Sequence, residues 1–443
     1  MAIIPQRSLF RWDEVEELGD LERLALVLRT IPDERLMRTL EAERGKGRDE
    51  YPIRAVWNSL LAGVVFGHES VESLRRELRR NGQLRALCGF DPVRGEAAVP
   101  GSWVYSRFLS SLFRHQGAVD AMLDELVEGL REALDGFGRV LAMDGKALPS
   151  HARPRGRDEA PKARDGRRDT DADWGAKSST ATREDGTTYQ KVLHWFGYKL
   201  HLVVDATYEL PVAYEVTEGS VNEIERAPAL VEGLRACHPE LIAACEALVA
   251  DKAYDSTEFL CGLWDDETLG IKPVVAIRDC WQDGEATRLV SGQRNVVYDY
   301  KGTVYCHCPH SGVRRAMAYG GFEADRGTLR YRCPARHYGV ACRGQERCPV
   351  RGAVRIKLSE DRRVFTPIAR SSYTWARHYA RRGAVERVNS RLDVSFGFER
   401  HFIRGLAKMR CRVGLSLVVM LAMALGRAKE KRRELMRSLV RAA

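Results

Sequence analysis

Three acidic residues that lie far apart in the chain could together perform metal-dependent phosphoryl chemistry. Asp144 directly follows the apolar residues of "GRVLAMDGKAL", and Asp251 directly follows those of "CEALVADKAYDS". Glu386 lies within the arginine-rich stretch "HYARRGAVERVNSRLD". Carboxylate oxygens suit Mg²⁺ or Mn²⁺ better than Zn²⁺. Two such ions, about 3.5–4 Å apart, can hold both the attacking and the leaving oxygen of an in-line phosphoryl displacement.

Each of these acids also has a plain structural interpretation. An aspartate after a strand is commonly a turn or cap residue. Arg382 and Glu386 at i,i+4 could form an ordinary helix-surface ion pair, worth roughly a few tenths of a kcal/mol. The three acids taken together, on a strand, a strand and a helix, favour the catalytic interpretation over three separate coincidences.

The third acid belongs to a helix with two distinct faces. At about 100° per residue, four polar side chains should share one flank: Tyr379, Arg382, Glu386 and Asp393. A separate apolar stripe should face the core: Val385, Val388 and Leu392. The polar flank could therefore line a groove.

The two aspartates require strands to position them. The runs ending at Asp144 and Asp251 predict buried strands, and in open α/β sheets ligands bind at the carboxyl ends of strands. Between them, "HWFGYKLHLVVDAT" and "PVAYEVTEGS" predict an antiparallel hairpin with its turn at 205–211. The segment 149–191, which lacks Val, Ile, Leu, Met and Phe, predicts a long polar loop. Trp174 in this loop could stack on a base or anchor the loop.

Composition limits the class of protein. The chain has 443 residues and a formal net charge of +10, which suits two or three domains and a polyanionic partner. No signal peptide is apparent at the N-terminus. The most apolar run, 413–426, is shorter than the about 18–20 residues that span a bilayer, so we expect a buried helix. Residues 1–135 predict helices, either a helix-turn-helix-like DNA reader or a plain bundle.

Five cysteines of the segment 280–365 could bind a structural zinc ion. They are Cys306, Cys308, Cys333, Cys342 and Cys348. Thiolates suit Zn²⁺, although the spacing is not the common double CxxC. The alternative is a small β-rich unit with free thiols.

The chain resembles DDE-type insertion-sequence transposases with a ribonuclease H-like catalytic core. In one group of that family the third-acid helix carries Y-x2-R-x3-E-x6-K, which is matched here by Tyr379, Arg382 and Glu386, with Asp393 in place of the lysine. The motifs "AMDGK" and "ADKAYDS" resemble those around the family's first and second aspartates. The stretch "FGYKLHLVVDATYELPVAYEVTEGSVNE" resembles the hairpin between them.

The resemblance implies a fold and an activity. The fold would be α/β, a ribonuclease H-like mixed sheet flanked by helices. We expect a helical DNA-binding domain (1–135), the core (136–279 and 366–427), the cysteine-rich insertion (280–365) and a basic tail (428–443). Asp144, Asp251 and Glu386 would hold two Mg²⁺ or Mn²⁺ ions, cut transposon ends and join the 3′-hydroxyl to target DNA. The phosphate contacts would come from this set: Tyr379, Arg382, Arg387, Arg391 and Lys199.

The resemblance also implies partners, a location and rival functions. The partner would be double-stranded DNA, bound by a homodimer in the bacterial cytoplasm at the nucleoid, with no membrane. Lys199 and its neighbour His201 could instead pair with carboxylates. One rival is a ribonuclease H-like nuclease that cuts DNA without joining it. Another is a DNA-binding regulator descended from a transposase.

Overall fold

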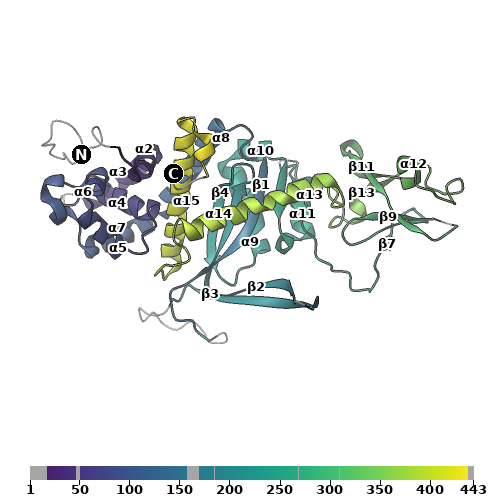
Figure 1. The fold of residues 1–443 in the computed structure, drawn as a ribbon, viewed down its shortest axis with the longest axis horizontal. Helices are drawn as coiled ribbons and strands as arrows, with labels where there is room; N and C mark the ends of the chain where they lie inside the picture. The colour runs from purple at the N-terminus through teal and green to yellow at the C-terminus, as the bar shows by residue number, and fades with distance from the viewer. Residues whose placement is uncertain are drawn as a thin grey trace.

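The computed structural model describes residues 17–45, 50–156, 169–183, 185–267, 269–308 and 310–437. The chain is elongated, with helices at one end, a mixed sheet in the middle and a small β-rich unit at the other end (Figure 1). Much of the polar loop expected after the first strand, residues 157–168, lies outside the described part, as do residues 1–16 and the last six residues of the basic tail.

The N-terminal part is helical, as predicted. It contains α2 (Leu21–Thr30), α3 (Glu34–Arg44), α4 (Ile53–Val65), α5 (Val71–Arg80), α6 (Gly82–Cys88), a 3₁₀ segment η1 (Pro92–Ala98), α7 (Ser102–Arg114) and α8 (Gln116–Ala133). Ser70 caps α5, because its hydroxyl accepts a hydrogen bond from the Ser73 backbone N–H at 3.1 Å. The buried Asp33 accepts hydrogen bonds from Trp57 Nε1 and Arg54 Nη1, both at 2.5 Å, and this ties α3 to α4.

A mixed sheet forms the centre of the chain. Its strands are β1 (Val140–Pro149), β2 (Asp173–Thr182), β3 (Thr188–Asp205), β4 (Leu210–Glu218), β5 (Ala247–Ala250) and β6 (Lys272–Val275). The connecting helices are α9 (Glu223–Cys237), α10 (Pro239–Ala244), η2 (Lys252–Tyr254) and α11 (Thr257–Asp265). β3 pairs antiparallel with β1 and β4, while β5 pairs parallel with β1 and β6. The predicted hairpin is confirmed as β3 and β4.

The expected polar loop was wrong over residues 173–182 and 188–191. There β2 and the first half of β3 form a long two-stranded ribbon, paired from Asp173 with Gly197 to Thr182 with Thr188, which projects from the sheet (Figure 1). Backbone hydrogen bonds hold a two-stranded ribbon without apolar burial, so its polar sequence carries no periodic signal. Trp174 anchors the base of the ribbon: its Nε1 donates to the Arg155 carbonyl at 2.8 Å.

C-terminal helices cover the sheet and join it to the helical part. They are α13 (Tyr373–Tyr379), the 3₁₀ turn η5 (Ala380–Arg382), α14 (Gly383–Val394) and α15 (Leu406–Lys429), followed by η6 (Arg433–Leu435). α15 is the one helix in the described ranges that is long and apolar enough to cross a membrane, and 89% of its most apolar window is buried. The predicted buried helix is confirmed. The basic tail does not continue α15, because Lys431 adopts a positive φ of 59°.

Residues between β6 and α13 form a separate unit with its own apolar core. Its first sheet holds β7 (Arg288–Leu289), β8 (Val296–Tyr298), β9 (Val304–His307) and β10 (Arg314–Ala316). Its second sheet holds β11 (Ala318–Glu323), β12 (Thr328–Arg332) and β13 (Ala353–Lys357). The short elements η3 (Ala324–Arg326), α12 (Pro334–Tyr338) and η4 (Leu358–Glu360) complete it.

Candidate active site

The two aspartates lie side by side in the central sheet. Asp144 was expected to end its strand, but β1 continues to Pro149, because it stays paired with β3 beyond Asp144. β1 and β5 are parallel neighbours, and Met143 pairs with Ala250, so the next residues are Asp144 and Asp251. Asp144 is 6% exposed, and its Oδ1 accepts a hydrogen bond from the Gly145 N–H at 2.8 Å. Oδ1 of Asp251 accepts from the Ala253 N–H at 2.7 Å. The sheet register therefore brings together two acids that are 107 positions apart in the sequence.

Burial makes the charge of Asp144 unfavourable. Desolvation raises the pKa of this carboxyl, and the neighbouring Asp251 raises it further. Lys177 of the ribbon, with Nζ 3.9 Å from Asp144 Oδ1, and Arg382 oppose this rise. The two neighbouring carboxyl groups, Asp144 and Asp251, therefore attract positively charged groups to this part of the sheet.

Glu386 joins the aspartates through one guanidinium. Arg382 Nη1 lies 3.6 Å from Asp144 Oδ2, and Arg382 Nη2 donates to Glu386 Oε1. Burial lowers the pKa of Arg382, but the carboxylates of Glu386 and Asp144 outweigh it and hold this pKa above its ordinary value. The Glu386 side chain is 56% exposed, so rotation of this side chain can release Arg382. Arg382 therefore links Glu386 to Asp144, which is the sheet neighbour of Asp251.

The apolar face of α14 holds the polar flank in place. The stripe predicted from the sequence is fully buried against the sheet: Val385, Val388 and Leu392. Tyr379, at the end of α13, stacks on Trp375 with ring centroids 4.6 Å apart. Burial raises the pKa of Tyr379, with smaller contributions from Asp251 and Asp144, which places its ring near both acids.

Asp393, which replaces the expected lysine, has a partner of its own. Lys146 Nζ donates to Asp393 Oδ2 at 2.6 Å, and the two side chains are 14% and 26% exposed. Lys146 follows Asp144 by two positions on β1. The pair therefore ties the end of α14 to the strand that carries the first acid.

Two further basic residues of α14 gather around Glu209 of the β3–β4 turn. Arg387 Nε lies 2.8 Å from Glu209 Oε1 and stays 55% exposed. Arg391 is only 12% exposed and donates to the Glu209 carbonyl; burial lowers its pKa to about 10. Arg437 also lies 3.1 Å from Glu209 Oε1. Arg391 therefore serves as an internal ion-pair partner here, and its contact with DNA stays a prediction.

Lys199 is likewise buried, as the structural alternative for it predicts. Its Nζ donates to the Val221 carbonyl at 2.7 Å and lies 3.2 Å from Glu223 Oε1. His201, on the same face of β3, is 1% exposed, and burial and Lys199 lower its pKa to about 4. These side chains support the sheet from within and do not present charge to the surface.

Two residues near the acids were missed as site residues. Glu223, in the first turn of α9, lies so close to Gly145 that a Cβ there would approach Glu223 Cγ to 2.7 Å. Tyr254 is 1% exposed, and its hydroxyl has no hydrogen-bond partner among the residues that the structure describes. Burial raises the pKa of Tyr254 well above its ordinary value, followed by the charges of Asp144 and Glu223. In the sequence, the only sign that Glu223 and Tyr254 belong to the site was that both lie in or beside the quoted motifs.

The donor set fits divalent cations, although the site is not preassembled. In the described ranges, no group of three or more His, Cys, Asp or Glu side chains is arranged to hold a metal ion. Arg382 and Lys177 supply the positive charge next to Asp144 that a bound metal ion would otherwise supply. The acids supply only oxygen, the charge of Asp144 is poorly compensated, and Glu386 is free to rotate. These features suit Mg²⁺ or Mn²⁺.

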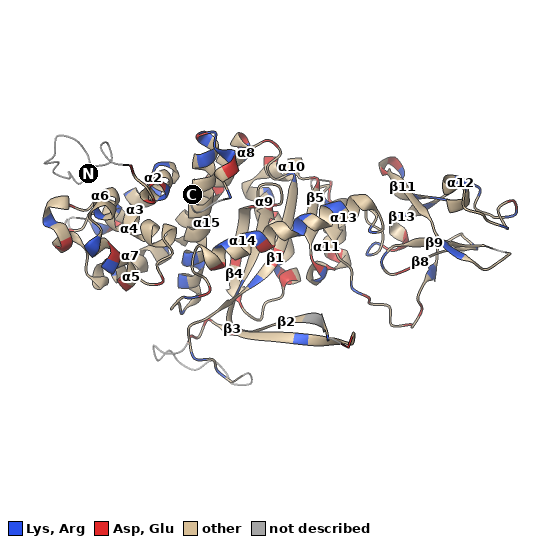
Figure 2. Cartoon of the chain, viewed as in Figure 1, with Lys and Arg blue, Asp and Glu red and all other residues tan. Residues whose placement is uncertain are grey.

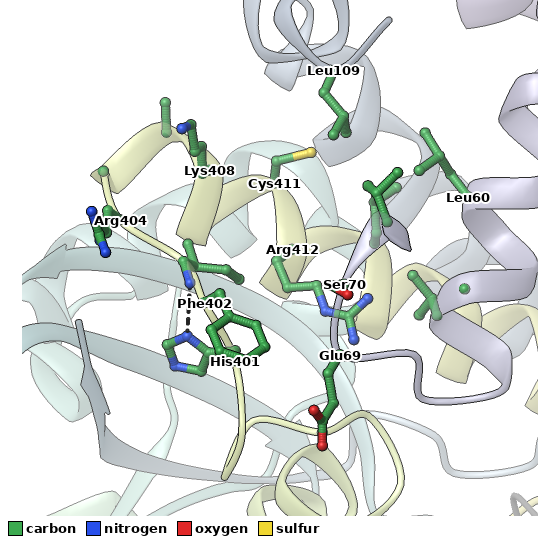
Figure 3. A pocket seen from close by; sticks show the side chains of 18 of the residues that line it. Leu60, Glu69, Ser70, Leu109, His401, Phe402, Arg404, Lys408, Cys411 and Arg412 are labelled. Carbon is green, nitrogen blue, oxygen red and sulfur yellow. Dashed lines mark hydrogen bonds between the residues drawn. The ribbon is translucent and has the colours of Figure 1, made fainter. Parts of the chain in front are cut away.

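A large cavity lies away from the acids. It measures about 730 Å³ and opens between α4, α5 and α7 of the helical part and the start of α15 (Figure 3). Basic side chains line one side, among them Arg400, Arg404 and Lys408. His401 Nδ1 accepts a hydrogen bond from the Ile403 N–H at 3.2 Å, which fixes the loop at its edge. The acid site is instead an open edge of the sheet.

The relation of Asp144 to protein stability gives a first prediction. Because its folded-state pKa is raised, the stability that its neutral form contributes is present below the unfolded pKa near 4 and is lost as pH rises through the folded pKa. In metal-free buffer, Asp144→Asn should therefore raise the free energy of unfolding at pH 7 by about 1 kcal/mol. The gain should disappear near pH 4. Thermal unfolding across pH measures this, with Asp325→Asn, at an exposed site, as the control; an equal gain at both pH values contradicts it.

The fold and this site define an α/β protein with clustered acids beside basic helices. Figure 2 shows Lys and Arg along α13 and α14. A family model described as "Transposase DDE domain" matches residues 135–422, well over half of the chain, and the chain belongs to this family. It is thus a DDE-type DNA transposase.

Comparison with other proteins adds one structural relative. A cryo-EM structure of the piggyBac transposase synaptic complex with hairpin DNA is similar, with 12% sequence identity and a TM-score of 0.39. The likeness covers 98% of this chain and 82% of that chain. No curated protein matches this sequence.

Proposed function

We propose that this transposase cuts the ends of an insertion sequence and joins the liberated 3′-hydroxyl to target DNA. One observation carries the proposal: Asp144 on β1 and Asp251 directly after β5 are neighbours in the sheet register, and Arg382 links Glu386 to Asp144. The mixed sheet, with acids at adjacent strand ends and a third acid on a covering helix, supports a ribonuclease H-like core.

Asp144, Asp251 and Glu386 would hold two Mg²⁺ or Mn²⁺ ions. When bound, such ions activate water or a 3′-hydroxyl as the nucleophile and stabilise the leaving oxygen. Gly145 and Ala253, through their backbone N–H groups, fix one oxygen of each aspartate, so the other oxygen of each would bind the cation. Glu386 would exchange Arg382 for a cation, and this exchange would free the guanidinium.

Arg382 would then bind a phosphate beside the reacting bond. Its pKa above the ordinary value keeps it charged, and a guanidinium binds phosphate oxygens in a bidentate manner. Tyr379, stacked on Trp375, offers an aromatic surface and a hydroxyl next to both aspartates. Arg387 is the most exposed of the proposed contacts on α14. DNA would therefore lie along the face of α13 and α14.

The assembly and location follow from the reaction. Two transposon ends must be held together for joining, so the active form would be at least a homodimer on double-stranded DNA. The net charge of +10 suits this polyanionic partner. We place the protein in the bacterial cytoplasm, at the nucleoid.

A strand-transfer assay tests the proposal. A labelled duplex that carries the terminal sequence of the element is incubated with a target plasmid, the full-length protein and Mg²⁺. The expected result is labelled strand covalently joined to plasmid, which Ca²⁺ in place of Mg²⁺ and the Glu386→Gln variant do not give. Cut but unjoined ends would identify a nuclease. Metal-independent binding without cutting would identify a DNA-binding regulator.

A further inference from the structure

The β-rich unit between β6 and α13 brings five cysteines to one small cavity. The cavity measures about 20 Å³, room for about one atom of solvent size. Its lining includes every cysteine predicted as a zinc ligand: Cys306, Cys308, Cys333, Cys342 and Cys348. All five thiols are free, and Cys306 has Cys333, Cys348 and Cys342 as electrostatic neighbours. The chain brings these cysteines together from positions up to 42 residues apart.

The thiols come from both sheets of this unit. Cys306 lies on β9 and Cys308 directly follows it, in the four-stranded sheet. Cys333 follows β12 of the three-stranded sheet and caps α12. Cys342 and Cys348 lie in the segment between α12 and β13. A ligand that bound thiols from both sheets at once would therefore link the two sheets.

The surroundings suit a soft cation better than water. A buried water needs two to four good hydrogen-bond partners, whereas thiols are weak donors and acceptors. The rest of the lining is partly apolar, with Pro334, Ala335 and Val350, and partly polar, with His307 and Gln345. Zn²⁺ takes four thiolates in structural sites. The guanidinium of Arg315 also lines the cavity, where it would offset the negative charge of a thiolate cluster.

Hydrogen bonds already point at the sulfur atoms. Asn295 Nδ2 donates to Cys348 Sγ at 3.5 Å. Backbone N–H groups of His310, Ser311 and Gly344 donate to Cys308. Such donors orient metal ligands from outside and stabilise the thiolate form.

We propose that this unit binds one structural Zn²⁺ through Cys333, Cys342, Cys348 and a thiol from Cys306 or Cys308. The thiols are not arranged around a common point in the described structure, so binding would draw them together by side-chain rotation. The ion would stabilise a unit whose apolar core is small. This inference is independent of the DNA chemistry proposed above.

Metal analysis of the full chain, purified without chelators, tests the inference. We expect one zinc per chain in the unmodified protein. Cys333→Ser, Cys342→Ser, Cys348→Ser and the double variant Cys306→Ser/Cys308→Ser should each lower bound zinc about tenfold or more. Cys237→Ser, at an exposed cysteine of α9, is the matched control and should keep it.

A second measurement covers variants that fail to fold. Co²⁺ added to unmodified protein after zinc removal should give the absorption bands of tetrahedral thiolate coordination. Zinc removal should also lower the thermal stability of the unmodified protein without changing that of a folded cysteine variant. Absence of both zinc and Co²⁺–thiolate bands in the unmodified protein would overturn the inference. Disulfides among these cysteines, found by mass spectrometry without reductant, would also overturn it.

Discussion

Asp144→Asn, Asp251→Asn and Glu386→Gln should each lower the rate of DNA strand cleavage by about 10³-fold or more. Each change removes one negative oxygen from the acid cluster but keeps the shape of the side chain. Asp144 and Asp251 share the sheet edge, and Glu386 reaches it through Arg382. Cleavage of a labelled transposon end in Mg²⁺ measures the effect.

The same variants should still bind the transposon end, because the basic side chains of α13 and α14 are unchanged. Gel-shift titration in Ca²⁺ separates binding from cleavage, and Asp325→Asn, at an exposed acid of the β-rich unit, is the matched control. An Asp144→Asn protein that cuts at the unmodified rate would falsify the catalytic assignment. Taken with its predicted gain in metal-free stability, this variant should be more stable and inactive, a trade-off common at active sites.

Gly197→Ala should destabilise the protein by about 2–3 kcal/mol, or displace the ribbon formed by β2 and β3. Gly197 lies where β3 leaves the ribbon and enters the central sheet. A Cβ at this position would collide with the carbonyl oxygen of Leu148 and approach the Ser150 nitrogen to 2.5 Å. Both are backbone atoms, which cannot rotate away as a side chain can. Equilibrium urea unfolding measures the loss.

The matched control is Gly233→Ala, in the middle of α9. No atom lies within 4 Å of a Cβ built there, and alanine is a better helix former than glycine by about 0.8–1 kcal/mol. This variant should therefore be neutral or slightly stabilised. Equal stability of the Gly197→Ala and unmodified proteins would show that the ribbon junction is not tightly packed.

The sequence predicted the parts of the site that depend on apolar pattern. The strand before Asp251, the hairpin between the two aspartates and the buried stripe of α14 left periodic or continuous apolar signals, and the structure confirms them. The strand that carries Asp144 was predicted too, but its end was wrong, because β1 continues to Pro149 through backbone pairing with β3. The ribbon left none, because backbone hydrogen bonds rather than buried side chains hold β2 to β3. Lys177, which the ribbon carries to Asp144, was missed for the same reason.

Ion-pair partners were harder to predict than elements. Nothing local in the sequence connects Arg391 with Glu209, 182 positions away, or Asp393 with Lys146. Which charges are buried together depends on how α14 crosses the sheet. The phosphate contacts of Arg391 and Lys199 were predicted from family analogy and composition. Neither of these shows whether a side chain is buried in the folded protein.

The Asp393–Lys146 pair has a consequence for how this chain could evolve. A lysine in place of Asp393 alone would set two ammonium groups face to face where 2.6 Å now separates opposite charges. Like charges at such a distance repel strongly in a half-buried setting. A lysine at position 393 is therefore compatible with this packing only if residue 146 also changes, so the two positions constrain each other although they are far apart in the chain.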